Sequence, residues 1–571
     1  MDERQRLAAR IRAARGEIPA DLVLSGGRVV NLFDGSLEEV DLAVFDGVIV
    51  GLGRYQGKER VELGGRYLAP AFIEGHLHLE STLLTPAQLA AAVCPRGTGA
   101  VVADPHEIAG VMGPAGVRAM LEASRDLPVS FYFNLPSCVP ATHLETAGGA
   151  LDAGDIQDML DWPRVPGLAE MMNYPGVLAG DPGVLDKLRA ARGRVMDGHA
   201  PLLGGNDLNA YLLAGPDSDH ECVGRQEAAL KLARGMWIMI RQGTSAHNLE
   251  ELLPLVNPVT ERRCLLVSDD RHPDDLAHQG HLDDLLRRAV AQGLDAITAL
   301  RLVTLNPARR FGLRDRGALA PGRRADLVVL EDLREFKVLQ VYQAGRLVAR
   351  EGEMLQPPRA DFDPAARRTM NLPELVPEML ETPAEGGRVR IIELVPGQIL
   401  TNQAVEEAPV ERGRLAAHPE RDLARLWVIE RHQASGRVGR GLLRGLGLRA
   451  GALAGSVAHD SHNLVLAGVD TTSALTAARR VAALGGGLCL ARGEQVLAEL
   501  PLPLAGLMSD QDLATVLDQL KRLRRAAREL CSHPEPFMPL SFVALPVIPH
   551  LRLTDLGLVD VDQFQVVDLF V

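Results

Sequence analysis

The chain has 571 residues, of which 46% are hydrophobic and 24% are charged. This length and composition are typical of a globular protein with two or three domains. Asp and Glu outnumber Lys and Arg by 74 to 61, and the net charge of −13 argues against a nucleic-acid-binding surface, which would carry a basic excess. Short basic stretches such as residues 521–528 are predicted to be solvated helix faces.

The six cysteines are scattered and form no C-x-x-C pair. Neither a disulfide framework nor a zinc knuckle is therefore expected, and a reducing compartment is favoured. The first 17 residues are charged with a helical period and lack the apolar core of a signal peptide, and no later run of about 18 apolar residues follows. We expect a cytoplasmic protein with no membrane partner.

The segments in chain order predict three kinds of domain. Residues 1–69 read as a helix followed by the first part of a small β domain, with Gly and Asp-Gly turn signals between short strands. Residues 314–358 return to the same β-like pattern. A Pro-rich stretch at 353–364 then marks a linker, and residues 359–571 form a further domain.

Residues 70–313 contain eight apolar runs, each followed by a helical stretch. The runs are 71–76, 98–107, 129–137, 166–172, 193–200, 214–221, 236–243 and 263–270. Eight βα units in a row predict a (β/α)8 TIM-like barrel, whose functional groups sit at the C-terminal ends of the strands. The predicted fold class is α/β: this barrel, a small composite β-sandwich domain and an additional C-terminal α+β domain.

Potential metal ligands stand at these strand ends. They are His76, His78, Glu170, His199, His220 and Asp269. A lone His is more often a hydrogen-bonded residue, and a lone Asp is more often a helix N-cap. Four His and two carboxylates at the ends of five strands favour instead a metal centre, in which one carboxylate bridges two divalent ions. Imidazole and carboxylate ligands suit manganese, iron or zinc.

Other polar residues have two interpretations each. Glu80, Asp104, His106 and Glu107 are candidates for an additional metal site or a substrate clamp, and a hydrogen-bond network is the equal alternative. His459 and His462 are predicted to lie on a surface turn, although they could reach the barrel mouth from the C-terminal domain.

Several motifs together resemble the adenine deaminase family, a branch of the amidohydrolase superfamily. They are "PAFIEGHLHLES" (70–81), "VVADPHE" (101–107), "EMMNYPGV" (170–177), "DGHAP" (197–201), "AGPDSDHE" (214–221) and "SDDRHPDDL" (268–276). "AHDSHN" (458–463) and "LPLPLAGLMSD" (500–510) look like the C-terminal domain of that family. The resemblance runs from about Leu22 to the end. Ala71, where the family commonly has Gly, departs from the pattern only in the turn into the strand.

The resemblance implies hydrolysis of adenine to hypoxanthine and ammonia at a binuclear centre, usually described with Mn²⁺ or Fe²⁺. The six candidate ligands fall on the metal positions of the family, and Glu170 stands where many superfamily members have a carboxylated lysine. Two cations that share one water lower its pKa, so a bridging hydroxide is available to attack C6 of adenine. Zinc is an alternative metal.

Proton transfer and substrate binding need further groups. Asp269 is predicted to shuttle the proton as well as bind metal, with a purely ligating role as the alternative. Glu80 and His272 are the other catalytic candidates. Asp270, Arg271 and Glu107 are predicted to bind the purine, and salt-bridged anchoring of the loop is the alternative for the residues that follow Asp269.

Three other functions have weaker support. Hydrolysis of another cyclic amide or of an N-acetyl sugar would use the same metal pair. Zinc deaminases that act on polynucleotides rely on P-C-x-x-C, which this chain lacks. A non-catalytic metal scaffold fits poorly with a complete ligand set. We expect free adenine to be preferred to adenosine or AMP, and the protein to be a homo-oligomer, specifically a dimer.

Overall fold

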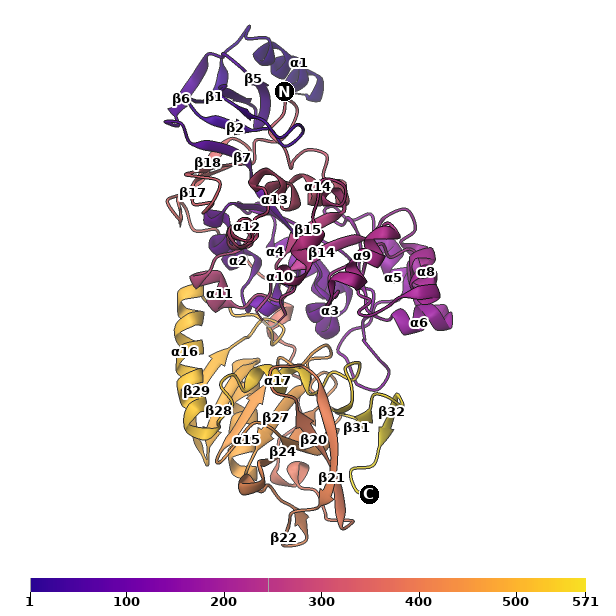
Figure 1. Ribbon diagram of the computed structural model, residues 1–571. Coiled ribbons are helices and arrows are strands. Elements are labelled where there is room, and N and C mark those ends of the chain that lie inside the picture. The colour runs from indigo at the N-terminus through magenta and orange to yellow at the C-terminus, as the bar shows by residue number, and fades with distance from the viewer. Residues whose placement is uncertain (1, 245) are drawn as a thin grey trace.

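The structure, a computed structural model, describes residues 2–244 and 246–571. Figure 1 shows a β-rich N-terminal part, a mixed central part and a C-terminal part arranged one after another. Helix α1 (Glu3–Ala14) opens the chain and starts at a capping box, in which the Asp2 side chain accepts the Gln5 N–H. Within the described residues, no helix has the length and apolar character needed to cross a bilayer.

Two sheets make up the N-terminal part. The smaller has the order β5-β4-β1-β6, and the larger has the order β19-β18-β17-β16-β7-β2-β3. In the larger sheet β16 (Leu327–Leu330) pairs antiparallel with β7 (Tyr67–Pro70), and β2 (Arg28–Val30) pairs parallel with the other edge of β7. Segments before and after the central part therefore share one sheet. The remaining strands are β1 (Ala20–Ser25), β3 (Leu37–Glu38), β4 (Leu42–Phe45), β5 (Val48–Leu52), β6 (Gly57–Glu62), β17 (Val338–Gln343), β18 (Arg346–Arg350) and β19 (Glu353–Met354).

Eight strands run through the central part, and each contains part of one predicted apolar run. They are β8 (Phe72–Leu77), β9 (Thr98–Ala103), β10 (Ser130–Phe133), β11 (Gly167–Met171), β12 (Val195–Gly198), β13 (Ser218–Asp219), β14 (Trp237–Arg241) and β15 (Cys264–Val267). Consecutive strands pair parallel within the groups β8-β9-β10, β11-β12 and β13-β14-β15. Single parallel bridges join Leu135 to Leu168 and Leu77 to Asp269. The expected α/β class is confirmed.

Helices follow the strands in the order that the sequence predicts. They are α2 (Pro86–Val93), α3 (His106–Met112), α4 (Pro114–Ala123), α5 (Ala153–Met159), α6 (Tyr174–Ala179), α7 (Pro182–Ala190), α8 (Gly205–Ala214), α9 (Arg225–Ala233), α10 (Leu249–Leu252), α11 (Pro273–His278), α12 (Leu282–Ala291), α13 (Ala296–Leu302) and α14 (Leu305–Arg310). All six residues of β8 are buried, and only Ala71 separates β8 from β7. The N-terminal sheet thus leads directly into the first strand of the central part.

The C-terminal part is built on an eight-stranded sheet of order β21-β20-β25-β24-β27-β26-β28-β29. The strands are β20 (Arg388–Leu394), β21 (Thr401–Glu407), β24 (Leu423–Ile429), β25 (Val438–Arg444), β26 (Ala452–Gly455), β27 (Leu464–Gly468), β28 (Gly487–Arg492) and β29 (Gln495–Pro501). Three helices accompany this sheet: α15 (Thr471–Leu484) packs on β28, while α16 (Leu513–Leu530) and α17 (Phe537–Phe542) lie toward the central part in Figure 1.

Helix α16 contacts α11 across the boundary between the two parts. Arg524 of α16 forms ion pairs with Asp274 of α11 at 2.7 Å and with Glu535 at 2.8 Å. The prediction that residues 521–528 are only a solvated face is therefore wrong for Arg524. The charge pattern showed a basic helix but could not show which acidic residues would lie opposite it.

Candidate metal centre

The six predicted ligands lie together because parallel strands deliver them to the same end of the central part. His76 is in β8 and His78 follows it, while Glu170 is in β11. His199 and His220 come directly after β12 and β13, and Asp269 lies two residues after β15. Five of the six are buried, and His199 is partly exposed.

Glu170 is at the middle of this group. Its Oε2 lies 2.7 Å from His199 Nδ1 and 3.0 Å from His220 Nε2, and its Oε1 lies 3.4 Å from His78 Nε2. Burial alone would raise the pKa of Glu170, but the imidazoles of His220 and His199 outweigh it and hold the pKa well below the ordinary value. An ionised carboxylate whose two oxygens face different imidazoles has the form of a bridging ligand.

Asp269 is held from both sides. Its Oδ1 lies 3.4 Å from His76 Nε2 and 3.3 Å from His78 Nε2, and its Oδ2 accepts a hydrogen bond from Arg241 at 2.8 Å. Its backbone adopts a left-handed conformation with φ of 54°, and its N–H donates to the His76 carbonyl at 3.0 Å. Burial would raise the pKa of Asp269, but Arg241 and the neighbouring imidazoles keep it well below the ordinary value.

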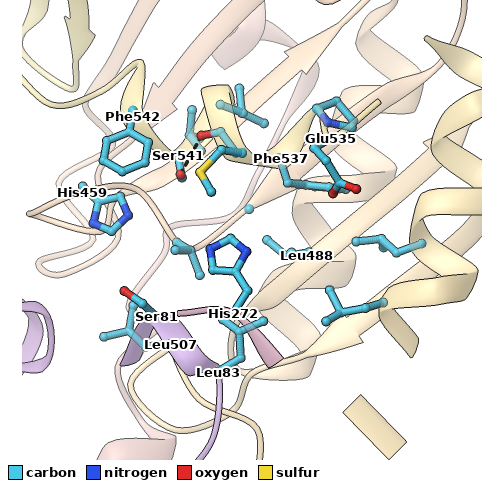
Figure 2. A pocket seen from close by; sticks show the side chains of 18 of the residues that line it. Ser81, Leu83, His272, His459, Leu488, Leu507, Glu535, Phe537, Ser541 and Phe542 are labelled. Atoms are coloured by element: carbon cyan, nitrogen blue, oxygen red, sulfur yellow. Dashed lines mark hydrogen bonds between the residues drawn. The ribbon is translucent and has the colours of Figure 1, made fainter. Parts of the chain in front are cut away.

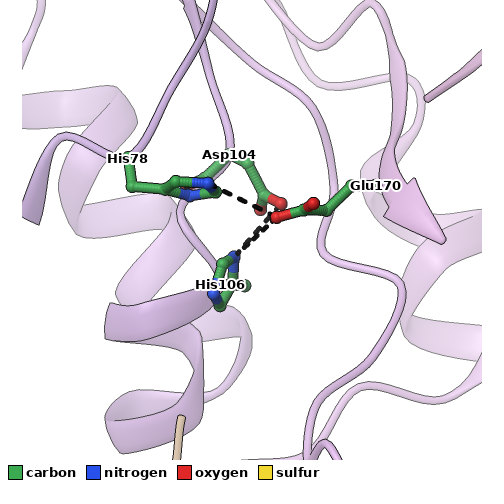
Figure 3. A group of neighbouring side chains, drawn as sticks. All are labelled: His78, Asp104, His106 and Glu170. Carbon is green, nitrogen blue, oxygen red and sulfur yellow. Dashed lines mark hydrogen bonds and ion pairs between the residues drawn. The ribbon is translucent and has the colours of Figure 1, made fainter. Parts of the chain in front are cut away.

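Asp104 and His106 join the group beside Glu170, as Figure 3 shows. His106 Nδ1 lies 3.2 Å from Asp104 Oδ2 and 3.8 Å from Glu170 Oε1. Both side chains are buried. Neither carboxylate oxygen of Asp104, nor Nδ1 of His106, has a hydrogen-bond partner among the residues that the structure describes. These two residues extend the donor set beyond the six predicted ligands.

The donor set fits divalent cations. Buried polar atoms are normally hydrogen-bonded, yet His76 Nε2 and His220 Nδ1 also have no such partner in the described part of the chain. Donor atoms of three overlapping groups lie within 4.8 Å of one another: His78, Asp104, His106 and Glu170; His76, Glu170 and His220; and His76, His78 and Asp269. Imidazole nitrogens and carboxylate oxygens at this spacing suit manganese, iron or zinc.

Glu107 is bound by two residues of the C-terminal part. Its Oε1 contacts His459 Nδ1 and its Oε2 contacts His462 Nε2. The prediction that these histidines lie on a surface turn was wrong, because the side chain of His462 is only 1% exposed. We call Glu107, His459 and His462 the Glu107 clamp.

The protonation of the clamp follows from its hydrogen bonds. His462 Nδ1 accepts the backbone N–H of Ala458 at 3.1 Å, and burial lowers the pKa of His462 to about 4. The neutral ring therefore carries its proton on Nε2 and donates it to Glu107. This nitrogen has no lone pair for a cation, so His462 contacts Glu107 through a hydrogen bond, although the three donor atoms of the clamp are close enough to hold a metal ion.

Four of the residues predicted for catalysis or substrate binding line a cavity of about 110 Å³ at the boundary with the C-terminal part: Glu80, Glu107, Asp270 and His272. Glu80 Oε1 accepts the Ile108 N–H at 3.0 Å, while its Oε2 is buried without a partner in residues 2–244 and 246–571. Burial raises the pKa of Glu80 to about 7. Asp270 accepts a short hydrogen bond from the Ser81 hydroxyl, and burial lowers the pKa of His272.

Arg271 points elsewhere. Its guanidinium donates to Asp284 at 2.9 Å and to the Gln242 carbonyl at 3.2 Å, and it is not among the residues that line the cavity. These contacts support the alternative interpretation of Arg271, in which it anchors its loop through a salt bridge instead of binding the purine.

Two residues that support the candidate ligands, Arg241 and Glu74, were not predicted from the sequence. Arg241 ends β14 and donates to Glu221 Oε2 and to Asp269, both at 2.8 Å, while Glu221 Oε1 lies 3.4 Å from His220 Nε2. A strand-end arginine in the run 236–243 was the available signal.

Glu74 is the other missed residue. Its carboxylate accepts the backbone N–H of His76 at 3.0 Å and that of Ser268 at 3.1 Å, and it lies 3.2 Å from His281 Nε2. Glu74 thereby ties β8 to the residue before Asp269 and holds two ligand-bearing segments together.

The chain has known relatives over almost its whole length. Residues 67–348 match the Amidohydrolase family, and residues 398–565 match the Adenine deaminase C-terminal domain. A solved β-aspartyl dipeptidase from Fervidobacterium islandicum aligns with a TM-score of 0.46 and 13% identity, over 59% of this chain and 98% of that one. An adenine deaminase from Oleidesulfovibrio alaskensis is 49% identical, and adenine deaminase 2 from Carboxydothermus hydrogenoformans is 48% identical; each alignment covers 98% of both chains. The chain belongs to the adenine deaminase family.

Proposed function

We propose that the protein hydrolyses adenine to hypoxanthine and ammonia with two divalent ions bound at the strand-end cluster. The observation that carries this proposal is the convergence of imidazoles on both oxygens of Glu170, in a chain that is similar over its whole length to adenine deaminases. The match to the Adenine deaminase C-terminal domain supports this reaction over hydrolysis of another cyclic amide.

We also infer that the eight central strands close into a (β/α)8 barrel over residues 70–313. The parallel bridge from Leu77 to Asp269 and the order of the other pairs support closure. The pairing of β16 with β7 supports one composite β domain made of residues 1–69 and 314–358, followed by the domain at 359–571.

The ligands divide into two sets around Glu170. His76, His78 and Asp269 would hold one ion, and His199 and His220 would hold the other. When bound, such a pair supplies an acidified water at neutral pH. The oxygen and nitrogen donors favour Mn²⁺ or Fe²⁺, and Zn²⁺ is the alternative.

Glu80 is better placed than Asp269 to carry the proton. Both oxygens of Asp269 are engaged, one near two imidazoles and the other with Arg241. Glu80 keeps Oε2 without a partner among the described residues and lines the cavity, so this oxygen can take a proton and return it to the purine. Asp270, with one oxygen fixed by Ser81, would orient the base.

The test is ammonia release from adenine by the metal-loaded protein, with adenosine, AMP and a hydantoin as comparison substrates. We expect adenine to be used far better than adenosine or AMP, because a small closed pocket leaves no room for a ribose. Elemental analysis should give close to two ions per chain. Hydrolysis of the hydantoin without ammonia release from adenine would reject the proposal.

A further inference from the structure

The cavity of about 110 Å³ lies between the strand ends and the C-terminal part. The strand-end side contributes Glu80, Glu107, Asp270 and His272 to its lining, and most of the remainder comes from residues 455–542. Figure 2 shows His459 and Phe542 on one side of this space, and Leu488 and Phe537 on another. The C-terminal part therefore forms most of the wall of the space that opens beside Glu80.

We propose that this wall is the specificity surface for the purine, with His459 contacting the base and Phe542 positioning His459. The inference rests on the proposed deamination and adds to it a role for the C-terminal part. The base would lie with its C6 edge toward Glu80 and Asp270 and with its N9 edge toward the C-terminal wall.

His459 is fixed by two contacts and keeps one free edge. Its Nδ1 contacts Glu107, and its ring stacks on Phe542 with 4.4 Å between ring centroids and 19° between planes. Its Nε2 makes no hydrogen bond within the described part of the chain, and its side chain is 13% exposed where that of His462 is 1% exposed. His459 lines the cavity, and Nε2 is the ring nitrogen that its contact with Glu107 leaves unused.

Most of the rest of the wall is apolar, although Arg524, Glu535 and Ser541 also line the cavity. Leu488, Leu507, Phe537 and Met538 line it, and Leu83 lines the cavity from the strand-end side. A purine has apolar faces and carries its heteroatoms around the rim, so its faces suit this wall while its polar C6 edge needs the carboxylates. Arg524, at the margin, is already paired with Glu535 at 2.8 Å. A ribose on N9 would place hydroxyl groups against this largely apolar wall, where the Ser541 hydroxyl already donates to the Met538 carbonyl at 2.8 Å.

Three full-length, metal-loaded variants test the proposal: His459→Gln, Phe542→Leu and Leu488→Phe. The last fills the cavity without touching the Glu107 clamp. The measurements are kcat and KM for adenine, the dissociation constant of hypoxanthine by calorimetry, and metal content. We expect His459→Gln and Leu488→Phe to raise KM and the hypoxanthine dissociation constant roughly tenfold, which corresponds to about 1.4 kcal/mol, with both ions retained. Phe542→Leu should raise both severalfold and change kcat little.

Two substitutions outside the cavity serve as controls. His550→Gln and Phe564→Leu alter exposed residues of the same part of the chain and should leave every measurement unchanged. Wild-type KM and hypoxanthine binding in Leu488→Phe, or in His459→Gln with its metal retained, would overturn the inference. Failure of the wild-type protein to release ammonia from adenine would instead reject the proposed function, which is a separate outcome.

Discussion

Two buried glutamates, Glu170 and Glu107, are each contacted by histidines, yet the two sites differ. Around Glu170, ring nitrogens of His76, His106 and His220 have no hydrogen-bond partner among the described residues. At the Glu107 clamp, the second nitrogen of His462 accepts a backbone N–H, which places the proton on the nitrogen that faces the carboxylate. His462 therefore presents no lone pair to a cation at Glu107, whereas these three ring nitrogens around Glu170 have no partner that fixes their protons.

Residue type and spacing alone therefore do not separate a candidate metal centre from a hydrogen-bonded contact. The second partner of each imidazole does, because it decides which nitrogen carries the proton. The two sites are also linked, since His106 Nε2 lies 3.6 Å from Glu107 Oε1. Substitutions at each site should therefore have different consequences.

Replacement of the bridging carboxylate should have the largest effect. In Glu170→Gln, two cations would face each other with less negative charge between them. Metal affinity should therefore fall by more than about 100-fold, which is the largest loss usual for replacing a residue that only hydrogen-bonds to a metal ligand. Turnover should be lost together with the metal. Elemental analysis after dialysis and turnover at saturating Mn²⁺ measure this. Glu107→Gln is the matched control and should keep both ions; equal metal loss in both variants would contradict the distinction.

Glu80→Gln should come next. The amide cannot accept the proton, so turnover per bound metal pair should fall by about 10² to 10⁴-fold while metal content stays at the wild-type level. Asp269→Asn should behave differently and lose metal, because Asp269 lies between two imidazoles and Arg241. If Asp269→Asn keeps both ions and loses turnover while Glu80→Gln does not, Asp269 carries the proton.

Arg241→Met should have an intermediate effect. Its removal leaves the carboxylates of Glu221 and Asp269 without their shared cation and without the hydrogen bond that aims Asp269. The expected loss is about 10 to 100-fold in Mn²⁺ affinity, measured by titration of the metal-free protein, and excess Mn²⁺ should restore most turnover. Arg241→Lys keeps the charge and should lose less; an Arg241→Met protein with wild-type affinity would show that Asp269 does not need this support.

The smallest effect should follow from opening the Glu107 clamp. Glu107→Gln replaces two charge-assisted hydrogen bonds between the central and C-terminal parts, so the free energy of unfolding should fall by about 1.5 to 3 kcal/mol at saturating metal. Urea unfolding compared with the exposed variant Glu385→Gln measures it. A loss of metal rather than of stability would show that the clamp binds an ion.

Much of the central part could be predicted from sequence, because most of its strands are largely buried apolar runs, although β13 consists only of Ser218 and Asp219. The candidate ligands could be predicted because parallel strands bring their ends together, whatever the distance along the chain. The Glu107 clamp could not be predicted, since Glu107 in α3 and His459 in the loop between β26 and β27 are 352 residues apart.

The directions in which the side chains of the loop after β15 point could not be predicted either. Asp270, Arg271 and His272 are consecutive, yet Asp270 and His272 line the cavity and Arg271 turns to Asp284. Arg241 was missed because nothing in a strand-end arginine indicates whether acidic residues from neighbouring strands will converge on it. Such contacts depend on loop conformations that local sequence patterns do not determine.

The pairing of β7 with both β2 and β16 has a consequence for synthesis on the ribosome. Strand β2 is made before β7, but β16 is separated from it by residues 71–326. One edge of β7 thus stays unpaired while the whole central part is translated. At about 5–20 residues per second this takes tens of seconds. Until then the nascent chain exposes an unpaired strand edge, a ready site for mispairing with other chains. Chaperone demand should accordingly peak late in translation, and fall once residue 330 has left the exit tunnel.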